Sequence, residues 1–589
     1  MTFTTGARDR LVVAGSMRRR GTVSRLAGCI VAGVLGAAAA GAQVLPHVER
    51  PGEDRQRPPA QIREDQKPGL VLPPATPPAK ARELLSTGIR VRLSRFRFEG
   101  NTVFSGEELG RIVSRYENRE VGNEEIEEAR LAITRHYVNA GYVNSGAIVP
   151  DQEVNEGIVT IRVIEGRLTE IELSGEHGFR PGYLGGRIMP DAGRPLNVAE
   201  LQEKLQLLLE NPQIERINAE LGPGTQPGES TLRANVTEAK RYRIGIGLAN
   251  NRAPSVGPVR AEIHGGANNL LGHSDSLALR LGKTRGLHDG AVSYSVPVSS
   301  RDTMLTMRWD RNNSTVVEEP FRSLDIQGKS ETLEIALFHP LHRTLQDEVG
   351  GGLSIVKRRS ETFLLGEPFS FFPGVTDGKS RISALRLSAQ WVGRTVDSVL
   401  ALRWAWSLGL DAFGSTINHD ATPDSRFVAR LGQLQWVKRL GESRGELLAR
   451  GELQKTNGAL LSLEKYSVGG SESVRGYREN VFVRDNGWNA SLEYRLPVAR
   501  ILVPGLGDGP RDGQVRLALF TDAGRALDDA SAPGAARTIS SVGVGVRWDV
   551  SADAYLHLYK GVALRNVDIR ERDLQDSGIH FRIGIQKRF

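Results

Sequence analysis

The sequence predicts an all-β transmembrane barrel of sixteen antiparallel strands, preceded by two small α+β domains. Three observations predict this fold class: an export signal in residues 1–42, a β-α-α-β-β order that occurs twice in residues 89–239, and a two-residue alternation of apolar and polar residues through residues 240–589. Apolar residues at every second position are typical of strands with one buried or lipid-facing side.

The composition excludes several classes of protein. The chain has 589 residues, whereas a single domain usually holds roughly 100–200. A single Cys excludes a disulfide framework and any multi-cysteine metal site. Charged residues make up 25% of the chain, which is ordinary for a folded protein, and the 66 glycines suit the many turns of a β-rich architecture.

Residues 1–42 have the pattern of a secretory signal peptide. Six arginines stand against one aspartate, an uncharged run covers Leu26–Val44, and small residues precede the expected cleavage between Ala42 and Gln43. Of the formal net charge of +8, this segment carries +5 (six Arg less one Asp), which leaves +3 on the mature chain. We therefore expect an exported protein with no nucleic-acid partner.

The mature chain begins with a segment that is rich in proline and charge, residues 43–88. Proline breaks long helices and favours extended chain, so we interpret this segment as a linker. No later stretch offers the ~20 apolar residues that a membrane-spanning helix needs, which leaves a soluble exported protein or a closed barrel.

Residues 89–166 and 167–239 each contain one β-α-α-β-β unit. In the first unit the apolar residues of Val91–Phe98 predict a strand, helices follow from Ser105 and Asn123, and two short strands complete the unit. The second unit repeats this order. Two consecutive units of this kind predict two small α+β domains, each with its own core.

The helices predicted over 126–138 and 198–209 each have an apolar face. Such a face either packs into the domain core or borders a groove that binds a partner. The core interpretation is favoured, because amphipathic helices in small domains usually bury their apolar side.

From residue 240 onward the helical period gives way to alternation. Candidate strands begin near residues 241, 259, 274, 288, 302, 329, 347, 378, 398, 425, 445, 488, 514, 538, 554 and 578. Short turns alternate with long polar loops, which is natural for an outer-membrane barrel with periplasmic turns and external loops. The chain ends on Phe589 of an amphipathic strand, which resembles the recognition tail of outer-membrane proteins.

No enzyme or metal signature is present. Three Gly-Lys-Thr/Ser tripeptides, which start at Gly282, Gly328 and Gly378, lack the first glycine of a phosphate loop. His339 and His342 flank a proline that prevents the helix needed to align them on a metal, and no third ligand is near in sequence. We therefore expect no cofactor, no metal site and no catalytic activity.

The most specific group of residues lies in the longest loop, Lys455–Gly487. It contains the sequence Val474-Arg475-Gly476-Tyr477, and two strands later comes Phe520-Thr521-Asp522-Ala523-Gly524. If the alternating apolar residues before Phe520 face lipid, Phe520 and Asp522 face the lumen. A loop that folds inward would let the guanidinium of Arg475 bond Asp522 with two parallel hydrogen bonds. The alternative is an exposed Arg475 and an unrelated wall carboxylate, since surface ion pairs are common.

These two motifs behind two β-α-α-β-β units resemble the TpsB transporters of two-partner secretion, of the filamentous haemagglutinin and haemolysin secretion and activation type. The resemblance covers most of the mature chain. It implies a sixteen-stranded outer-membrane barrel (240–589), two periplasmic POTRA domains (89–166 and 167–239) and ATP-independent export of one large exoprotein. It also implies that Val474, Arg475, Gly476 and Tyr477 form the tip of an inward loop, with Asp522 as the partner of the arginine. The family often has an N-terminal plug helix, from which the proline-rich segment 43–88 departs.

The expected partners follow from the same resemblance. An unfolded exoprotein of adhesin or haemolysin type would bind the POTRA domains in the periplasm, outer-membrane lipid would surround the barrel, and the barrel-assembly machinery would insert it. An exposed sheet edge can accept an extended segment as an added strand whatever its sequence. Two alternatives remain open, an outer-membrane protein assembly insertase and a general porin or adhesin-like barrel.

Overall fold

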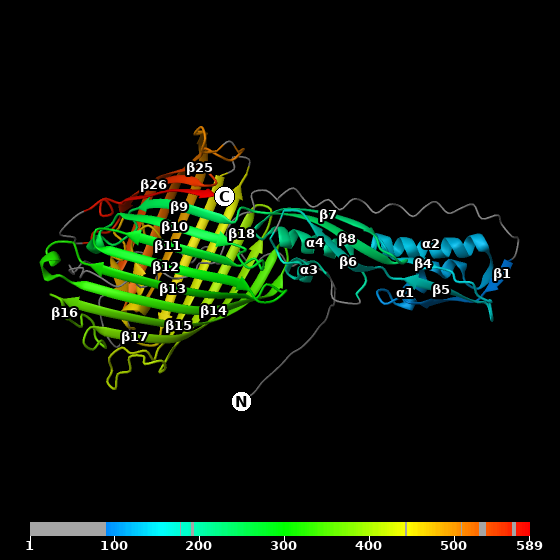
Figure 1. Cartoon of the computed structure of the whole chain (residues 1–589), viewed down its shortest axis with the longest axis horizontal. Helices are drawn as coiled ribbons and strands as arrows, with labels where there is room; N and C mark the ends of the chain where they lie inside the picture. The colour runs from blue at the N-terminus through cyan, green and yellow to red at the C-terminus, as the bar shows by residue number, and fades with distance from the viewer. Residues whose placement is uncertain are drawn as a thin grey trace, which may run out of the picture. The chain divides into compact units, whose positions relative to one another are not determined.

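The computed structural model describes residues 90–176, 178–189, 194–441, 445–507, 509–528, 537–567 and 573–589. The expected signal peptide, its cleavage between Ala42 and Gln43, and the proline-rich segment 43–88 lie outside these residues. Within the described residues, all α-helices occur before residue 210 and every strand from β9 onward follows residue 241 (Figure 1).

The first α+β segment contains two small sheets and two α-helices. Its elements are β1 (Arg90–Leu93), β2 (Arg95–Glu99), α1 (Gly106–Val113), η1 (Ser114–Tyr116), β3 (Arg119–Gly122), α2 (Asn123–Asn139), β4 (Gly146–Ile148) and β5 (Ile158–Ile164). The sheet order is β2-β5-β4, with β2 parallel and β4 antiparallel to β5. The strand expected over Val91–Phe98 is divided at Ser94, because β1 pairs instead with β3, an element that the sequence analysis missed.

The second α+β segment has the same topology. Its elements are β6 (Arg167–Ser174), α3 (Pro181–Ile188), α4 (Val198–Leu209), β7 (Ile214–Pro223) and β8 (Glu229–Glu238). The sheet order is β6-β8-β7, with β6 parallel and β7 antiparallel to β8. Two units with one strand order and one set of strand directions confirm the predicted pair of α+β folds.

Local sequence explains where the helices begin and which side they bury. The side chain of Ser105 accepts a hydrogen bond from the backbone N–H of Glu108, and that of Asn197 accepts from two backbone N–H groups, so both act as N-caps. Ala129, Ile133 and Tyr137, spaced by four residues along α2, are completely buried. The apolar faces of α2 and α4 therefore belong to the domain cores.

Sixteen strands of the described chain form a closed antiparallel barrel, as predicted. They are β9 (Tyr242–Ala249), β10 (Arg260–Asn268), β11 (Ser276–Lys283), β12 (Leu287–Pro297), β13 (Met304–Thr315), β14 (Gln327–Arg343), β15 (Asp347–Leu364), β17 (Lys379–Arg394), β18 (Ser398–Leu410), β19 (Val428–Leu440), β20 (Gly445–Thr456), β23 (Asn486–Arg500), β24 (Gln514–Leu527), β25 (Arg537–Ser551), β26 (Ala554–Ala563) and β27 (Ile579–Arg588). A two-residue strand, β16 (Glu367–Pro368), only extends the hairpin after β15. Every barrel strand begins within three residues of its predicted position.

Side chains alternate across the barrel wall. On β24, Leu519 is 48% exposed on the outside, whereas its neighbour Phe520 is 5% exposed on the inside. Ile244, Ile246 and Leu248 of β9 are likewise exposed at every second position. This alternation gives an apolar outer surface and a polar lumen, which is the arrangement of a membrane barrel. Among the described residues, none of the helices has the length and apolar character to cross a bilayer.

The barrel closes where the last strand pairs with the first. β27 runs antiparallel to β9 over seven residue pairs, from Arg582 opposite Ala249 to Arg588 opposite Arg243. The terminal residue extends this seam, since Phe589 and Tyr242 exchange two backbone hydrogen bonds of 3.0 Å and their rings lie 5.8 Å apart.

Candidate functional site in the barrel lumen

The loop between β20 and β23, residues 457–485, carries the motif that the sequence analysis singled out. It contains a short helix η4 (Ser462–Glu464) and a hairpin of β21 (Tyr466–Val468) and β22 (Phe482–Arg484). Its apolar side chains, among them Val468, Val474 and Tyr477, form one buried cluster with the inner-wall residues Ala526 and Ile539. A loop that packs this way lies inside the barrel, and we call it the inward loop.

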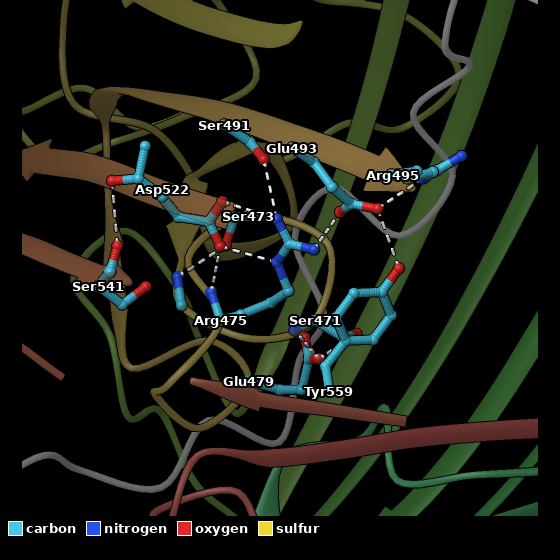
Figure 2. A network of polar contacts seen from close by, with 12 residues as sticks. Ser471, Ser473, Arg475, Glu479, Ser491, Glu493, Arg495, Asp522, Ser541 and Tyr559 are labelled. Carbon is cyan, nitrogen blue, oxygen red and sulfur yellow. Dashed lines mark hydrogen bonds and ion pairs between the residues drawn. The ribbon is translucent and has the colours of Figure 1, made fainter. Parts of the chain in front are cut away.

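Arg475 at the tip of the inward loop is bonded to two strands of the wall (Figure 2). Its Nε and Nη2 donate to the two carboxylate oxygens of Asp522 on β24, at 2.8 and 2.9 Å, and its backbone N–H donates to Asp522 Oδ2 at 3.0 Å. Its Nη1 donates to Glu493 on β23, and its Nη2 lies 3.1 Å from the hydroxyl of Ser491. The structure thus brings Arg475 and Asp522 together and adds a second carboxylate.

Two aromatic rings complete the surroundings of the guanidinium. The Cζ of Arg475 lies 3.6 Å from the ring centroid of Phe520 and 5.0 Å from that of Tyr559 on β26. Tyr559 also donates a hydrogen bond from its hydroxyl to Glu493 at 3.1 Å. A planar guanidinium suits both the carboxylate pair and the ring faces, whereas an ammonium would satisfy neither geometry as well.

The cluster is buried and its charges are matched. Arg475 is 6% exposed, Glu493 2% and Asp522 1%. Burial by itself would lower the pKa of Arg475, but the hydrogen bonds to Asp522 and the charges of Asp522 and Glu493 outweigh burial and raise that pKa above its ordinary value. Arg495 donates to the other oxygen of Glu493 at 2.6 Å. A buried pair of this kind is costly to break, because the remaining partner is left charged and unsolvated.

Close packing requires the glycines of both motifs. Gly476 has a φ of +97°, and a Cβ there would lie 3.2 Å from the Cβ of Ser541, next to the backbone of Gly561 on β26. A Cβ on Gly524 would lie 2.6 Å from Val468 and 2.9 Å from Val474. The loop tip can therefore reach the wall only because both positions lack a side chain.

Tyr477 attaches the loop tip to β25 and to the connection that follows β26. Its hydroxyl lies 2.9 Å from the carbonyl oxygens of both Ser540 and Arg565 and accepts a hydrogen bond from the backbone N–H of Arg565 at 3.1 Å. All four residues of the motif, Val474 to Tyr477, are buried. They hold Arg475 against the inner face of the wall, where it borders a lumenal cavity that Glu493 and Arg495 also line.

A second buried arginine, which the sequence analysis did not single out, follows the motif. Arg478 donates to both carboxylate oxygens of Asp576 at 2.8 and 2.6 Å, and to Glu318 at 2.8 Å. Asp576 lies between β26 and β27, and Glu318 lies between β13 and β14. Burial lowers the pKa of Arg478, but the pairing with these carboxylates outweighs it and raises that pKa. The inward loop is therefore bonded to two other loops at the same end of the barrel.

Glu479 is the next residue and is a partly buried carboxylate, and its side-chain hydrogen bonds within the described residues come from no cationic group. It accepts from the backbone N–H and the hydroxyl of Ser471, both at 2.7 Å, while its own backbone N–H donates to Gln575. Burial raises the pKa of Glu479, and the bonds from Ser471 only partly oppose this. Neither Glu479 nor Glu493 belongs to the predicted motifs, although the alternation of β23 already marks Glu493 as facing the lumen.

Comparison with known proteins assigns both parts of the chain. The family model described as "Haemolysin secretion/activation protein ShlB/FhaC/HecB" matches residues 228–548, more than half of the chain. A second model, "POTRA domain, ShlB-type", matches residues 91–166.

Curated relatives are similar at low identity. The outer membrane transporter CdiB of Escherichia coli O6:K15:H31 (strain 536 / UPEC) is 24% identical over 412 residues, which are 67% of this chain and 67% of that protein. The heme/hemopexin transporter protein HuxB of Haemophilus influenzae (strain 86-028NP) is 27% identical over 245 residues, 40% of this chain and 42% of that protein.

Solved structures share the fold. CdiB from Escherichia coli has a TM-score of 0.66 at 19% identity and covers 87% of this chain and 93% of its own. BamA from Haemophilus ducreyi lacking POTRA domains 1–3 has a TM-score of 0.50 at 15% identity and covers 84% of this chain and 100% of its own.

The sixteen-stranded barrel behind POTRA folds, together with the family match, defines an outer-membrane transporter. The chain belongs to the haemolysin secretion/activation protein family ShlB/FhaC/HecB. It resides in the outer membrane with its POTRA domains in the periplasm, as the sequence predicted. Since β9 starts at the periplasmic end, the inward loop and the loops that contain Glu318 and Asp576 begin and end on the extracellular side of the wall.

Proposed function

We propose that this chain exports one large, unfolded exoprotein of adhesin or haemolysin type across the outer membrane in a two-partner secretion pathway. The observation that carries the proposal is the family match across residues 228–548, which includes the inward loop and both strands that hold Arg475. Relatives named as outer membrane transporters support transport as the general activity.

Each segment of the chain has its own role in export. Residues 1–42 direct export, with cleavage after Ala42, and residues 43–88 form a linker. Residues 89–166 and 167–239 act as two POTRA domains, and residues 240–589 form the pore, with Phe589 as the end of the recognition strand used during barrel assembly. The described chain offers no arrangement for which we propose a catalytic reaction.

Capture of the client begins at the edges of the POTRA sheets. Each three-stranded sheet has its central strand, β5 or β8, paired on both sides, so the outer strands keep one edge without a partner in the sheet. An extended segment of an unfolded client can add there as a further strand through backbone hydrogen bonds, which demand no particular sequence. The apolar faces of α2 and α4 are core, so backbone pairing carries this binding.

The inward loop controls the pore in this account. The pair of Arg475 and Asp522, reinforced by Glu493, holds the loop in the position from which transport starts. The client then passes through the polar lumen, and its folding outside makes the movement directional without ATP. The cost of separating the buried pair means that the loop occupies one defined position rather than many.

An insertase is the second candidate function, favoured by the shared fold with BamA. The two candidates are distinguished by co-expressing the full chain with a candidate large exoprotein in a strain that lacks both. Export predicts that the exoprotein reaches the medium only when the chain is present, while the amounts of other outer-membrane barrels stay unchanged. Loss of those barrels on depletion of the chain, with no effect on the exoprotein, would favour the insertase.

A further inference from the structure

Basic side chains are concentrated at the extracellular end of the outer barrel surface. The alternation that exposes Leu353 and Ile355 on β15 continues outward to Lys357 and Arg359, and that of Leu387 on β17 continues to Arg381. The outward-facing basic residues at this end of β13 to β20 are Arg311, Lys329, Lys357, Arg359, Lys379, Arg381, Arg430 and Lys455. Two acidic residues, Glu331 and Glu361, share this surface, which we call the cationic belt.

Like charges lie directly opposite each other in two places on the belt. Arg359 of β15 is the register partner of Arg381 of β17, and Arg430 of β19 is the register partner of Lys455 of β20. Directly opposite side chains have Cβ atoms about 4.5–5.5 Å apart, and like charges there destabilise a sheet. Within the described residues, no side-chain hydrogen bond or ion pair involves any of these four groups. On its other side Arg359 lies opposite Glu331 of β14, which offsets part of the first repulsion, whereas the other register partner of Arg430 is Trp406 of β18.

On the lumen side of the same strands, the basic side chains have acidic partners within the chain. Arg358, the neighbour of Arg359, faces inward, bonds the carbonyl of Leu463 and lies 3.3 Å from Glu464. Arg386 of β17 is also paired with Glu464, at 2.9 Å. Inward arginines thus have carboxylates of the chain as partners, whereas the outward ones face the membrane. Among the described strand residues of the belt, the acidic ones are Glu331 and Glu361. Glu331 lies opposite Arg311 and Arg359 and accepts from the indole N–H of Trp309, and Glu361 lies opposite Lys329 and Lys379.

The first like-charge pair lies at the depth of the outer headgroups, whereas Arg430 is in register with Trp406 and Leu387, six positions nearer the periplasmic end of β17 than Arg381. On β17 the outward Trp391 and Arg381 are ten positions apart, which corresponds to about 33 Å along a strand and to about 25 Å along the membrane normal at a tilt of roughly 40°. This equals the height of the apolar band of such barrels, about 25 Å. Trp391 therefore marks the periplasmic interface and Arg381 the extracellular one. The two like-charge pairs are three strands apart, about 14 Å around the wall.

We propose that the cationic belt binds the phosphorylated, multiply acylated glycolipid of the outer leaflet. Phosphate groups between Arg359 and Arg381, and between Arg430 and Lys455, would turn each repulsive pair into a charge-assisted contact. The acyl chains would lie along the apolar wall below, where Trp404 and Leu453 are exposed. A lipid with phosphates on its headgroup fits both the basic pairs and the apolar wall below them. This lipid occurs in the outer leaflet alone.

Binding of lipid A to the purified full-length chain in mild detergent tests the proposal. The test variant replaces all four opposed groups: Arg359→Gln, Arg381→Gln, Arg430→Gln and Lys455→Gln. We expect it to bind diphosphorylated lipid A at least tenfold more weakly than the wild-type chain. Lipid A without phosphates and phosphatidylglycerol should bind the wild-type chain no better than they bind the variant.

A matched pair on one strand separates this effect from general loss of charge. Lys438 lies on the same outward face of β19 as Arg430 but at the periplasmic end. Arg430→Gln should weaken lipid A binding several-fold, and Lys438→Gln should leave it within twofold of wild type. These two single substitutions test the proposal even if the fourfold variant does not fold. Equal effects of the two substitutions, unchanged binding by the folded fourfold variant, or equal binding of dephosphorylated lipid or phosphatidylglycerol would overturn the proposal.

Discussion

Arg475 and Asp522 form a bidentate ion pair, with nitrogen–oxygen distances of 2.8 and 2.9 Å, between the tip of the inward loop and strand β24 (Figure 2). The Asp522 side chain has no exposed surface and that of Arg475 has 7%. Because the loop itself excludes water from the pair, the position of the loop and the stability of the pair depend on each other.

Asp522→Asn should release the inward loop while the barrel still assembles. The amide keeps the shape of the carboxylate but removes its charge, so Arg475 keeps only one of its two carboxylate partners. Breaking a buried pair usually costs about 3–5 kcal/mol, and retention of Glu493 places the expected loss near 3 kcal/mol. Protease cleavage within residues 457–485 of the purified chain measures the release. Cleavage no faster than in wild type would contradict this role.

Arg475→Lys should release the inward loop almost as much as Asp522→Asn does. An ammonium cannot form the two parallel hydrogen bonds to Asp522, and it cannot stack on the ring of Phe520 as a guanidinium does. The charge is preserved in this variant. If protease protection of the loop were fully retained, charge alone would explain the contact and the bidentate geometry would be irrelevant.

Arg478→Ala and Asp576→Asn should loosen the outer half of the inward loop without moving Arg475. Arg478 and Asp576 are bonded at 2.8 and 2.6 Å and both are largely buried. We expect a higher single-channel conductance in planar bilayers for each variant. A double-mutant cycle on the unfolding free energy should give a coupling of about 1–3 kcal/mol. Additive effects of the two substitutions would show that the pair does not act as a unit.

Glu479 should make the inward loop sensitive to pH. Burial raises its pKa above the ordinary value of 4.5, so the folded loop favours the protonated form. The contribution to stability is then complete below pH 4.5 and is lost as the pH rises through the raised pKa. Glu472 adds to the raised pKa and Arg252 opposes it.

The neutral variant Glu479→Gln measures this effect. Its melting temperature relative to wild type should increase as the pH is raised above 4.5 through the raised pKa of Glu479. A constant difference across that range would show that Glu479 does not titrate in the folded loop.

Glu165 should support the first POTRA domain. It accepts from the backbone N–H groups of Thr102 and Val103, at 2.6 and 2.8 Å, and from the hydroxyl of Tyr137 at 2.9 Å. Burial acts to raise its pKa, but the hydrogen bond from the Thr102 hydroxyl, together with these bonds, outweighs burial and lowers it. Stability from Glu165 is therefore present at neutral pH and is lost as the pH falls below 4.5.

Glu165→Gln should lower the unfolding free energy of this domain at pH 7 by about 1 kcal/mol, since charged hydrogen bonds contribute about 1.5–3 kcal/mol and partial exposure screens part of that. Urea unfolding of the full chain, followed by the helical circular-dichroism signal, reports it because all described α-helices lie in the two POTRA units. The difference from wild type should shrink at pH 3. An equal difference at both pH values would assign the effect to packing.

The periodic parts of this fold could be predicted from sequence, and the contacts made by irregular chain could not. Strand alternation determines which side of β24 faces the lumen, and Phe520 and Asp522 lie on the buried side. Helical spacing located α2 and α4. Strand β3 was missed because its four residues carry no alternation of their own and depend on pairing with β1. Glu493, Arg478 and Glu479 gain their partners only when the inward loop meets the wall and the neighbouring loops, which no local pattern encodes.

We expect export to depend on the inward loop being held by Arg475. The direct measurement is the amount of exoprotein in the medium per folded barrel for wild type, Arg475→Ala and Arg260→Ala. Arg260 is also a buried lumenal arginine, bonded to Asp289 of β12 at 2.9 and 2.5 Å, but it does not contact the inward loop. Arg475→Ala should reduce export at least a hundredfold while Arg260→Ala keeps most of it. Normal export by a folded Arg475→Ala barrel would contradict the account.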